Sequence, residues 1–326
     1  MIKDRAQIVQ ELYNQGNQLN SKNSLYKQWI FRYTFLELEK DLQENGDITT
    51  DSIIHEPKKV TARIYANEGG ILAGGDEINY FLMESDSAFK PQIKNLEITQ
   101  RLRDGDFFAK DDMIMEIVGD IKDILKVERI VLNLISHMSS IATKTSRIIE
   151  IANKANPNVC IVPTRKTTWG LLDKRATFLG GGGTHRLNLS DAILIKDNHL
   201  AFFENSPVKL FENFIPPKKP YKFFEIEIDD PDQVVETAKL LIKLQTEKKI
   251  PSPGIIMFDN IAPIKIEQLL RKLREEALFD SLLFEASGGI NENNVERYAK
   301  TGIDVISMGS LTQKIEPIDI SLEIGI

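Results

Sequence analysis

Six short apolar runs in the second half of the chain limit its possible folds more than any other feature. They begin roughly 20–35 residues apart, which is the length of a strand, a loop and a helix. The runs are nearly continuous rather than alternating, as expected of parallel strands covered on both faces. Such a pattern predicts repeated βα units, which close into a barrel or form a doubly wound sheet. The runs are Val159–Val162, Ala192–Ile195, Phe223–Ile228, Gly254–Phe258, Leu282–Phe284 and Val305–Met308.

The first half of the chain has a different pattern. Asp4–Glu39 has apolar residues at roughly helical spacing and predicts helix, with a weak stretch at Gly16–Ser24. Glu128–Ala155 carries one apolar stripe and predicts the clearest helix of the chain. Short strand-like segments lie between them at Val60–Asn67, Gly69–Gly75 and Met113–Val118. We therefore expect an N-terminal domain over residues 1–127 and a β/α catalytic domain over 128–311, with residues 312–326 packing back on the first.

The composition of the 326 residues excludes several classes of protein. A hydrophobic fraction of 42% provides enough apolar material for a core and excludes a disordered chain. With 41 basic and 48 acidic residues the net charge is −7, which argues against a dedicated nucleic-acid-binding protein. Cys160 is the only cysteine, so no disulfide forms within one chain, and its apolar neighbours predict a buried, inert thiol.

The sequence shows neither a targeting segment nor a membrane span. The first thirty residues are polar and charged, without the apolar region of a signal peptide. The apolar runs are far shorter than the roughly 20 residues that a span requires. We expect a cytoplasmic protein without a membrane partner.

Polar residues follow the six apolar runs. The carboxyl ends of parallel strands meet at one edge of a β/α barrel, which is where such enzymes carry out their chemistry. We therefore expect these polar side chains to line one functional mouth. Its candidate cations are Arg165, Lys166, His185, Arg186 and Lys196. In an acidic protein such a cluster repels itself unless the ligand is strongly anionic, and these residue types suit carboxylate and phosphate groups.

Glu227 and Asp259 are the acidic counterpart of these cations. Two carboxylates on adjacent strands can hold Mg²⁺ or accept hydrogen bonds from ribose hydroxyls. Glu225 lies two residues from Glu227, and the spacing alone leaves open which of the two faces the site.

Glycine-rich segments are candidate anion-binding loops. Gly180–Gly183 precedes His185, and Ser287–Gly289 and Gly309 follow the last two runs, a recurrent phosphate position in β/α barrels. Arg129 is predicted to open the long helix. A cation there opposes the helix dipole unless an anion lies nearby.

In this order the motifs resemble the quinolinate phosphoribosyltransferase family, from Asn45 almost to the C-terminus. The matching segments are Asn45–Thr50, Gly69–Gly74, Glu128–Leu134, Thr164–Thr168, Gly181–Arg186, Leu194–His199, Glu225–Glu227, Met257–Asn260 and Ser287–Gly289. The resemblance implies an α/β fold with an N-terminal α/β sandwich and a C-terminal incomplete α/β (TIM-like) barrel. It also implies a homodimer with sites at the subunit interface. Trp169 departs from the pattern, since family members usually have proline there.

The resemblance implies transfer of a phosphoribosyl group from phosphoribosyl pyrophosphate to quinolinate with Mg²⁺ and no organic cofactor. The products are nicotinate mononucleotide, pyrophosphate and CO₂, in NAD biosynthesis. The residues implied to bind quinolinate are Arg165, His185, Arg186 and Lys196, with Arg129 from the partner subunit. Those implied to handle the phosphoribosyl and metal side are Lys166, Glu227, Asp259, Ser287, Gly288, Gly289 and Gly309. Among them Lys166, Glu227 and Asp259 are the implied catalytic residues, and Glu227 and Asp259 hold the metal directly or through water.

Three alternative hypotheses remain open. A related phosphoribosyltransferase would accept nicotinate or another heterocyclic acid without decarboxylation. A Schiff-base aldolase would use Lys196 as its nucleophile, and borohydride trapping tests for it. A catalytically idle anion sensor would release no pyrophosphate.

Overall fold

The structure, a computed structural model, describes residues 4–84, 93 and 96–325. The chain divides into two compact units. The first, hereafter the parallel-sheet unit, comprises Met1–Gln15, Arg147–Lys166 and Gly182–Leu311. The second, hereafter the antiparallel-sheet unit, comprises Gly16–Ser146, Thr167–Gly181 and Thr312–Ile326. The units therefore do not divide at residue 127, because the N-terminal segment belongs with the parallel sheet and most of the long helix with the antiparallel sheet.

The parallel-sheet unit contains six parallel strands in the order β6-β11-β10-β9-β8-β7. They are β6 (Cys160–Pro163), β7 (Ile193–Ile195), β8 (Phe224–Ile228), β9 (Gly254–Asp259), β10 (Leu282–Ser287) and β11 (Val305–Met308). Each coincides with one of the six apolar runs, so the prediction of repeated βα units is confirmed. Six strands are fewer than the eight of a complete barrel.

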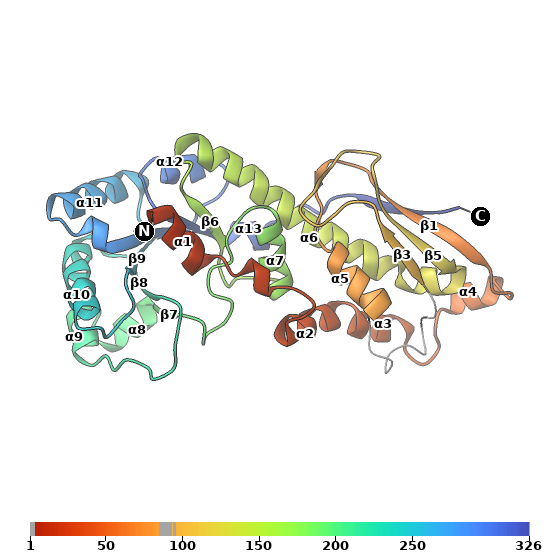
Figure 1. Cartoon of the computed structure of the whole chain (residues 1–326), viewed down its shortest axis with the longest axis horizontal. Helices are drawn as coiled ribbons and strands as arrows, with labels where there is room; N and C mark the ends of the chain where they lie inside the picture. Colours follow the sequence, from red (N-terminus) through yellow and green to blue (C-terminus); the bar gives the residue numbers. More distant parts are fainter. Residues whose placement is uncertain (1–3, 85–92, 94–95, 326) are drawn as a thin grey trace. The chain divides into compact units, whose positions relative to one another are not determined.

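Helices cover one face of this sheet (Figure 1). Leu241, Ile266 and Val295 from three of them share a hydrophobic core with Ile256 and Phe284 of the strands. Because alternate strand residues point to opposite faces, this core marks the outer face of the sheet. The helices that follow β7, β8, β9 and β10 are α8 (Asp197–Phe202), α9 (Pro207–Glu212), α10 (Val234–Thr246), α11 (Pro263–Glu275) and α12 (Val295–Ala299).

The inner face of the sheet is covered by α1 (Arg5–Tyr13). Its Val9 and Tyr13 pack against strand residues of alternate parity, such as Ile255 and Leu283. Cys160 lies in the same cluster as a free, buried cysteine, and burial raises the pKa of its thiol to about 12. The prediction of a buried thiol is confirmed, and its inertness stays a prediction.

The main sheet that the structure describes in the antiparallel-sheet unit has four strands, in the order β12-β1-β5-β3. They are β1 (Lys59–Ala66), β3 (Glu97–Gln100), β5 (Met113–Asp120) and β12 (Ile320–Gly325). The pairing of β12 with β1 brings the C-terminal residues onto this sheet. A separate pair joins β2 (Gly70–Ile71) to β4 (Phe107–Phe108), so the strand expected over Gly69–Gly75 is much shorter.

The helix predicted over Asp4–Glu39 is interrupted at its weak stretch. The side chain of Asn23 accepts the N–H groups of Leu25 and Tyr26 and so starts a new helix. The helices of this unit are α2 (Ser24–Tyr33), α3 (Phe35–Leu42), α4 (Ile48–Ile53), α5 (Gly75–Asn79), α7 (Leu171–Leu179) and most of α6 (Ile121–Ala155). Short helical segments of both units complete the described elements. They are a π turn at Tyr80–Glu84, 3₁₀ turns at Gly16–Gln18, Pro231–Gln233 and Phe279–Ser281, and α13 (Ser310–Gln313).

The long helix begins earlier than predicted. Buried Ile124 and Val127 extend its apolar stripe toward the N-terminus, and α6 starts at Ile121 rather than Glu128. The expectation that Arg129 opens the helix is therefore wrong, and no helix-dipole argument applies to it. Among the described residues, no helix combines the length and apolar character that crossing a bilayer requires.

Candidate active site

Three of the predicted site residues meet at the carboxyl ends of neighbouring strands. Lys196 directly follows β7, Glu227 lies near the end of β8, and Asp259 ends β9. Since β7, β8 and β9 are adjacent and parallel, these side chains share one edge of the sheet. The structure therefore brings them together as the sequence predicts.

Charges at this edge influence one another. Lys196 Nζ donates to Glu227 Oε2 at 3.3 Å. Burial raises the pKa of Glu227; Lys196 opposes the shift and the charge of Asp259 adds to it. Burial also raises the pKa of Asp259, whereas a hydrogen bond from Asn260 and the charges of Lys196 and Lys166 lower it. The edge is thus a mixed site in which the lysines partly neutralise two half-buried carboxylates.

Two arginines add positive charge to the same unit. Arg186 is buried and donates from Nη1 to the carbonyl of Ala192 at 3.4 Å. Burial lowers the pKa of Arg186, and the charge of Arg165, which follows β6, lowers it further. A guanidinium destabilised by burial and by a like charge favours an anionic ligand.

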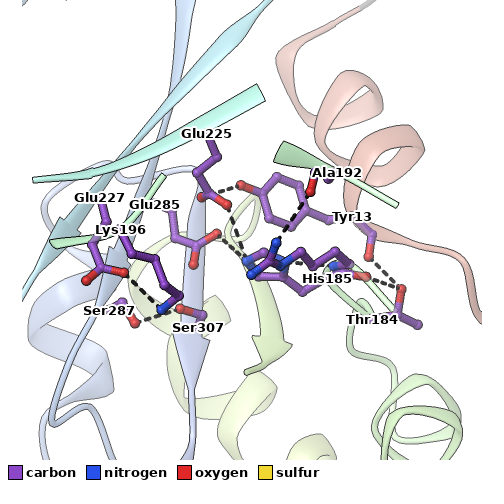
Figure 2. Close-up of polar contacts among 11 residues, drawn as sticks. Tyr13, Thr184, His185, Ala192, Lys196, Glu225, Glu227, Glu285, Ser287 and Ser307 are labelled. Atoms are coloured by element: carbon purple, nitrogen blue, oxygen red, sulfur yellow. Dashed lines mark hydrogen bonds and ion pairs between the residues drawn. The ribbon is translucent and has the colours of Figure 1, made fainter. Parts of the chain in front are cut away.

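His185 lies within a buried group of polar side chains (Figure 2). Its Nε2 is 3.5 Å from Glu225 Oε2 and 3.5 Å from Glu285 Oε2. Tyr13 Oη donates to Glu225 Oε1 at 3.2 Å. His185 Nδ1 accepts the backbone N–H of Arg186 at 2.7 Å. Because Nδ1 accepts, Nε2 carries the proton and faces the two carboxyl groups.

The two glutamates of this group have opposite pKa shifts. Burial raises the pKa of Glu225 well above its usual range, and the charge of Glu285 adds to the effect. Burial acts on Glu285 as well, but His185, Ser307 and Tyr13 stabilise its charge and lower its pKa. The surroundings thus disfavour the charged form of Glu225 and favour that of Glu285. Glu225 is fully buried beside His185, whereas Glu227 pairs with Lys196 at the strand ends. Of the two glutamates, Glu227 is therefore the one at the strand-end edge.

The loop after β10 has a backbone that requires glycine. Gly288 and Gly289 have φ values of +89° and +63°, which favour glycine. A Cβ at Gly288 would lie 2.3 Å from Asn260 Oδ1, so Asn260 and the loop approach closely. Ser307 Oγ donates to Ser287 Oγ at 2.9 Å. Gly309 directly follows β11, and β11 pairs with β10, so Gly309 lies at the same edge of the sheet as the Ser287–Gly289 loop.

The Gly180–Gly183 loop does not fit the expectation that it presents N–H groups to an anion. Gly183 N donates to Ile161 O and Thr184 N to Tyr13 O, so these groups are used within the protein. Both ring nitrogens of His185 face protein groups in this structure. Its direct contact with a substrate carboxylate stays a prediction from the sequence.

Other predicted and unpredicted residues lie as follows. Arg129 is exposed on α6 in the antiparallel-sheet unit, whereas every other predicted site residue belongs to the parallel-sheet unit. The sequence analysis missed Tyr13 and Glu285 as parts of the site. Glu285 carried a signal, since it is an acid that directly follows the apolar run Leu282–Phe284. Tyr13 carried none, because its partners are distant in sequence.

Trp169 is held by aromatic neighbours within the antiparallel-sheet unit. Its ring stacks on His137 at 4.0 Å and on Tyr33 at 4.6 Å. Asp173 accepts the N–H groups of Thr168 and Trp169 and pairs with His137 Nε2 at 2.6 Å. The departure from proline is therefore accommodated by a stack that fixes this loop.

The donor chemistry shows where Mg²⁺ fits. Mg²⁺ takes oxygen ligands and keeps several water molecules. Glu227 and Asp259 offer carboxylate oxygens and are only partly buried. Among the described residues, His185, Glu225 and Glu285 form the one other candidate group, with ligand atoms within 4.8 Å of one another, but it is buried and includes a nitrogen donor. The strand-end carboxylates therefore fit a hydrated Mg²⁺ better than the His185 group does.

Models of one protein family match the chain in two consecutive parts. The model described as quinolinate phosphoribosyl transferase, C-terminal domain, matches residues 141–323. The model for the N-terminal domain matches residues 47–139. The chain belongs to the quinolinate phosphoribosyltransferase family. The family resemblance and the fold class predicted from the sequence are confirmed.

Individual relatives agree with this membership. A probable nicotinate-nucleotide pyrophosphorylase [carboxylating] from Methanocaldococcus jannaschii is 37% identical over 302 residues, covering 90% of this chain and 97% of the relative. Its counterpart from Methanothermobacter thermautotrophicus is 36% identical over 282 residues, covering 85% and 93%. The solved nicotinate-nucleotide pyrophosphorylase from Francisella tularensis has a TM-score of 0.72 at 29% identity, covering 91% and 96%.

Proposed function

We propose that this quinolinate phosphoribosyltransferase family member joins quinolinate to phosphoribosyl pyrophosphate and releases CO₂. The products are nicotinate mononucleotide and pyrophosphate, in NAD biosynthesis. Family membership and the carboxylating names of the relatives support the reaction. The observation that carries the proposal is the charge pattern of the parallel-sheet unit. Arg165 and Lys196 follow β6 and β7, Arg186 lies in the loop before β7, and Glu227 and Asp259 lie at the ends of β8 and β9.

On the quinolinate side, the cations hold a dicarboxylate. Arg186 binds one carboxylate through its fork, and Arg165 and Lys196 supply further positive charge. His185 orients Arg186, since its Nδ1 accepts the Arg186 N–H. Lys196 Nζ is engaged by Glu227 at 3.3 Å, a contact that a Schiff-base nucleophile would have to give up, which disfavours an aldolase.

On the phosphoribosyl side, the acids face developing positive charge. Glycosyl transfer passes through an oxocarbenium-like state, which nearby carboxylates such as Glu227 and Asp259 stabilise. Lys166 supplies positive charge for the pyrophosphate. Glu227 and Asp259 would hold Mg²⁺, directly or through water, and the bound ion would neutralise charge on pyrophosphate. The remaining phosphate-binding groups in the proposal are Ser287, Gly288, Gly289 and Gly309.

Decarboxylation follows transfer and needs no organic cofactor. Loss of CO₂ leaves an electron pair on the ring carbon beside the pyridinium nitrogen, whose positive charge stabilises it. That carbon then takes a proton from water, which gives nicotinate mononucleotide. The chain contributes orientation of the ring and electrostatic stabilisation. A homodimer whose partner subunit supplies Arg129 completes the proposed site. Dimerisation and a cytoplasmic location remain predictions from the sequence.

Incubation with phosphoribosyl pyrophosphate, Mg²⁺ and quinolinate should release one CO₂ for each nucleotide formed, because the cations suit a dicarboxylate. Parallel assays with nicotinate, following nucleotide by chromatography and labelled CO₂ by trapping, test this expectation. Faster turnover of nicotinate without CO₂ would establish the non-decarboxylating alternative instead. Failure to release pyrophosphate with either acid would support the anion sensor.

Asp259→Asn is expected to lower kcat and to shift the Mg²⁺ dependence to higher concentration. The substitution keeps the shape of the side chain but removes the charge that serves the ribose and the metal. Quinolinate affinity, measured by calorimetry, should change little. A matched control is Asp280→Asn, which alters an acid of the same unit on a 3₁₀ turn away from the strand ends. Selective loss of quinolinate binding in Asp259→Asn would contradict the assignment.

A further inference from the structure

The N-terminal segment Asp4–Gln15 precedes both family matches, the first of which begins at residue 47. The segment nevertheless belongs to the parallel-sheet unit. Asp4 caps α1 by accepting the N–H of Ala6 at 2.9 Å. Arg5 Nη2 donates to Asp304 Oδ2 at 2.7 Å. The segment is therefore anchored at its start to the sheet unit that carries the candidate site.

The end of this segment binds the backbone just before Arg186. The carbonyl of Tyr13 accepts the N–H of Thr184 at 2.7 Å and that of His185 at 3.0 Å. Gln15 N donates to Thr184 Oγ1 at 3.0 Å. A Cβ at Gly183 would lie only 3.0 Å from Tyr13 O. Glycine at this position therefore lets the N-terminal segment approach the loop closely.

The Tyr13 side chain contacts His185 from the same direction. It is fully buried, its ring meets the His185 ring edge-on at 5.2 Å, and it stacks on Phe223 at 5.1 Å. Its hydroxyl donates to Glu225, whose other oxygen faces His185 Nε2 (Figure 2). Burial raises the pKa of Tyr13 well above its usual range, so the hydroxyl stays a donor. Tyr13 thus constrains both the ring and the backbone of His185.

His185 needs such constraint. Its φ is +52°, in the left-handed region that residues other than glycine seldom adopt. A backbone of this kind persists when its surroundings hold it, and it is concentrated at functional sites. The same residue accepts the Arg186 N–H, so the conformation of His185 sets the start of the Arg186 side chain.

We propose that Tyr13 is a positioning residue of the substrate site, which fixes His185 and, through it, Arg186. The proposal rests on the proposed function in one respect, namely that Arg186 binds a quinolinate carboxylate. It extends the site to a segment outside the matched family domains.

Tyr13→Phe tests the proposal, and Tyr26→Phe is its matched control. Tyr26 is also fully buried and donates to a buried glutamate, Glu77, at 2.6 Å, but in the antiparallel-sheet unit. Tyr13→Phe should raise KM for quinolinate about two- to tenfold, the usual effect of one lost hydrogen bond, with KM for phosphoribosyl pyrophosphate almost unchanged. Tyr26→Phe should lower thermal stability without this selective change. Equal KM values for quinolinate in both variants, or parallel rises for both substrates, would overturn the proposal.

A second measurement uses no substrate. The chain has four histidines, so ¹⁵N-histidine labelling gives few side-chain signals, and His185→Gln assigns the one from His185. Tyr13→Phe should move the His185 Nε2 resonance and speed its proton exchange, whereas Tyr26→Phe should not. An unmoved His185 resonance in Tyr13→Phe would overturn the positioning role. The proposed function can also fail separately. If wild-type protein neither binds nor converts quinolinate, but Tyr13→Phe still moves the His185 Nε2 resonance, the proposed function is overturned and the contact by which Tyr13 positions His185 is retained.

Discussion

Arg186→Ala should lower kcat/KM for quinolinate about 10- to 100-fold, while the protein stays folded. Arg186 is only 5% exposed, and its fork is the best-placed donor for a substrate carboxylate. Removing it leaves that carboxylate unpaired in a site with little water. Binding of phosphoribosyl pyrophosphate, measured by calorimetry, should remain nearly intact.

Two further variants sharpen this test. Arg186→Lys keeps the charge but loses the planar fork, so its kcat/KM should fall between those of wild type and Arg186→Ala. Arg175→Ala controls for loss of a largely buried arginine, since Arg175 pairs with Asp76 in the antiparallel-sheet unit. If Arg186→Ala weakened phosphoribosyl pyrophosphate selectively, Arg186 would belong to the other half of the site.

Mixing two inactive variants, Arg129→Ala and Lys196→Ala, should restore about one quarter of wild-type activity if sites are shared across a dimer. Random exchange makes half of the dimers hybrids, and each hybrid has one site with both residues intact. The second site of each hybrid lacks both. If Arg129 instead served its own subunit, every site would lack one residue and no activity would return.

The exchange itself must be shown. Differently tagged subunits, purified over both tags, give the hybrid fraction directly, and its specific activity should be about half that of wild type. Lys122 lies within two turns of Arg129 on α6, is partly buried and pairs with Asp51 at 3.0 Å. Lys122→Ala is the matched control and should be active on its own, without mixing with a second variant. Fully exchanged but inactive hybrids would place Arg129 outside the partner's site.

The strands and their polar ends were predictable because each depends on local sequence. A run such as Gly254–Phe258 is apolar throughout and is followed at once by Asp259, so one short window contains both the strand and its functional residue. Parallel pairing then brings Lys196, Glu227 and Asp259 together without further information. The family resemblance supplied what the windows did not, namely the reaction.

The errors concern contacts between residues far apart in sequence. Tyr13 meets Glu225 across 212 positions, and no local pattern indicates that an N-terminal helix covers the inner face of the sheet. The backbone of Tyr13 also explains Gly183, since a Cβ at that position would lie 3.0 Å from Tyr13 O. The glycine therefore allows a close approach of protein backbone rather than of an anion. The early start of α6 was missed because the helix begins at Ile121, directly after β5 ends at Asp120, with no loop between them.

The pairing of β12 with β1 affects how the chain can fold during synthesis. Residues 320–325 supply an edge strand to a sheet whose first strand begins at Lys59. Conversely, α1 packs on strands that begin only at Cys160. Neither unit can therefore complete its fold during synthesis until the other is almost fully translated. Segments translated early, such as α1, meanwhile lack the strands on which their apolar residues pack. Such long-range closure slows folding and exposes apolar surface. Chaperone dependence of nascent chains, and refolding much slower than for a protein of equal size with sequentially complete domains, are the expected signs.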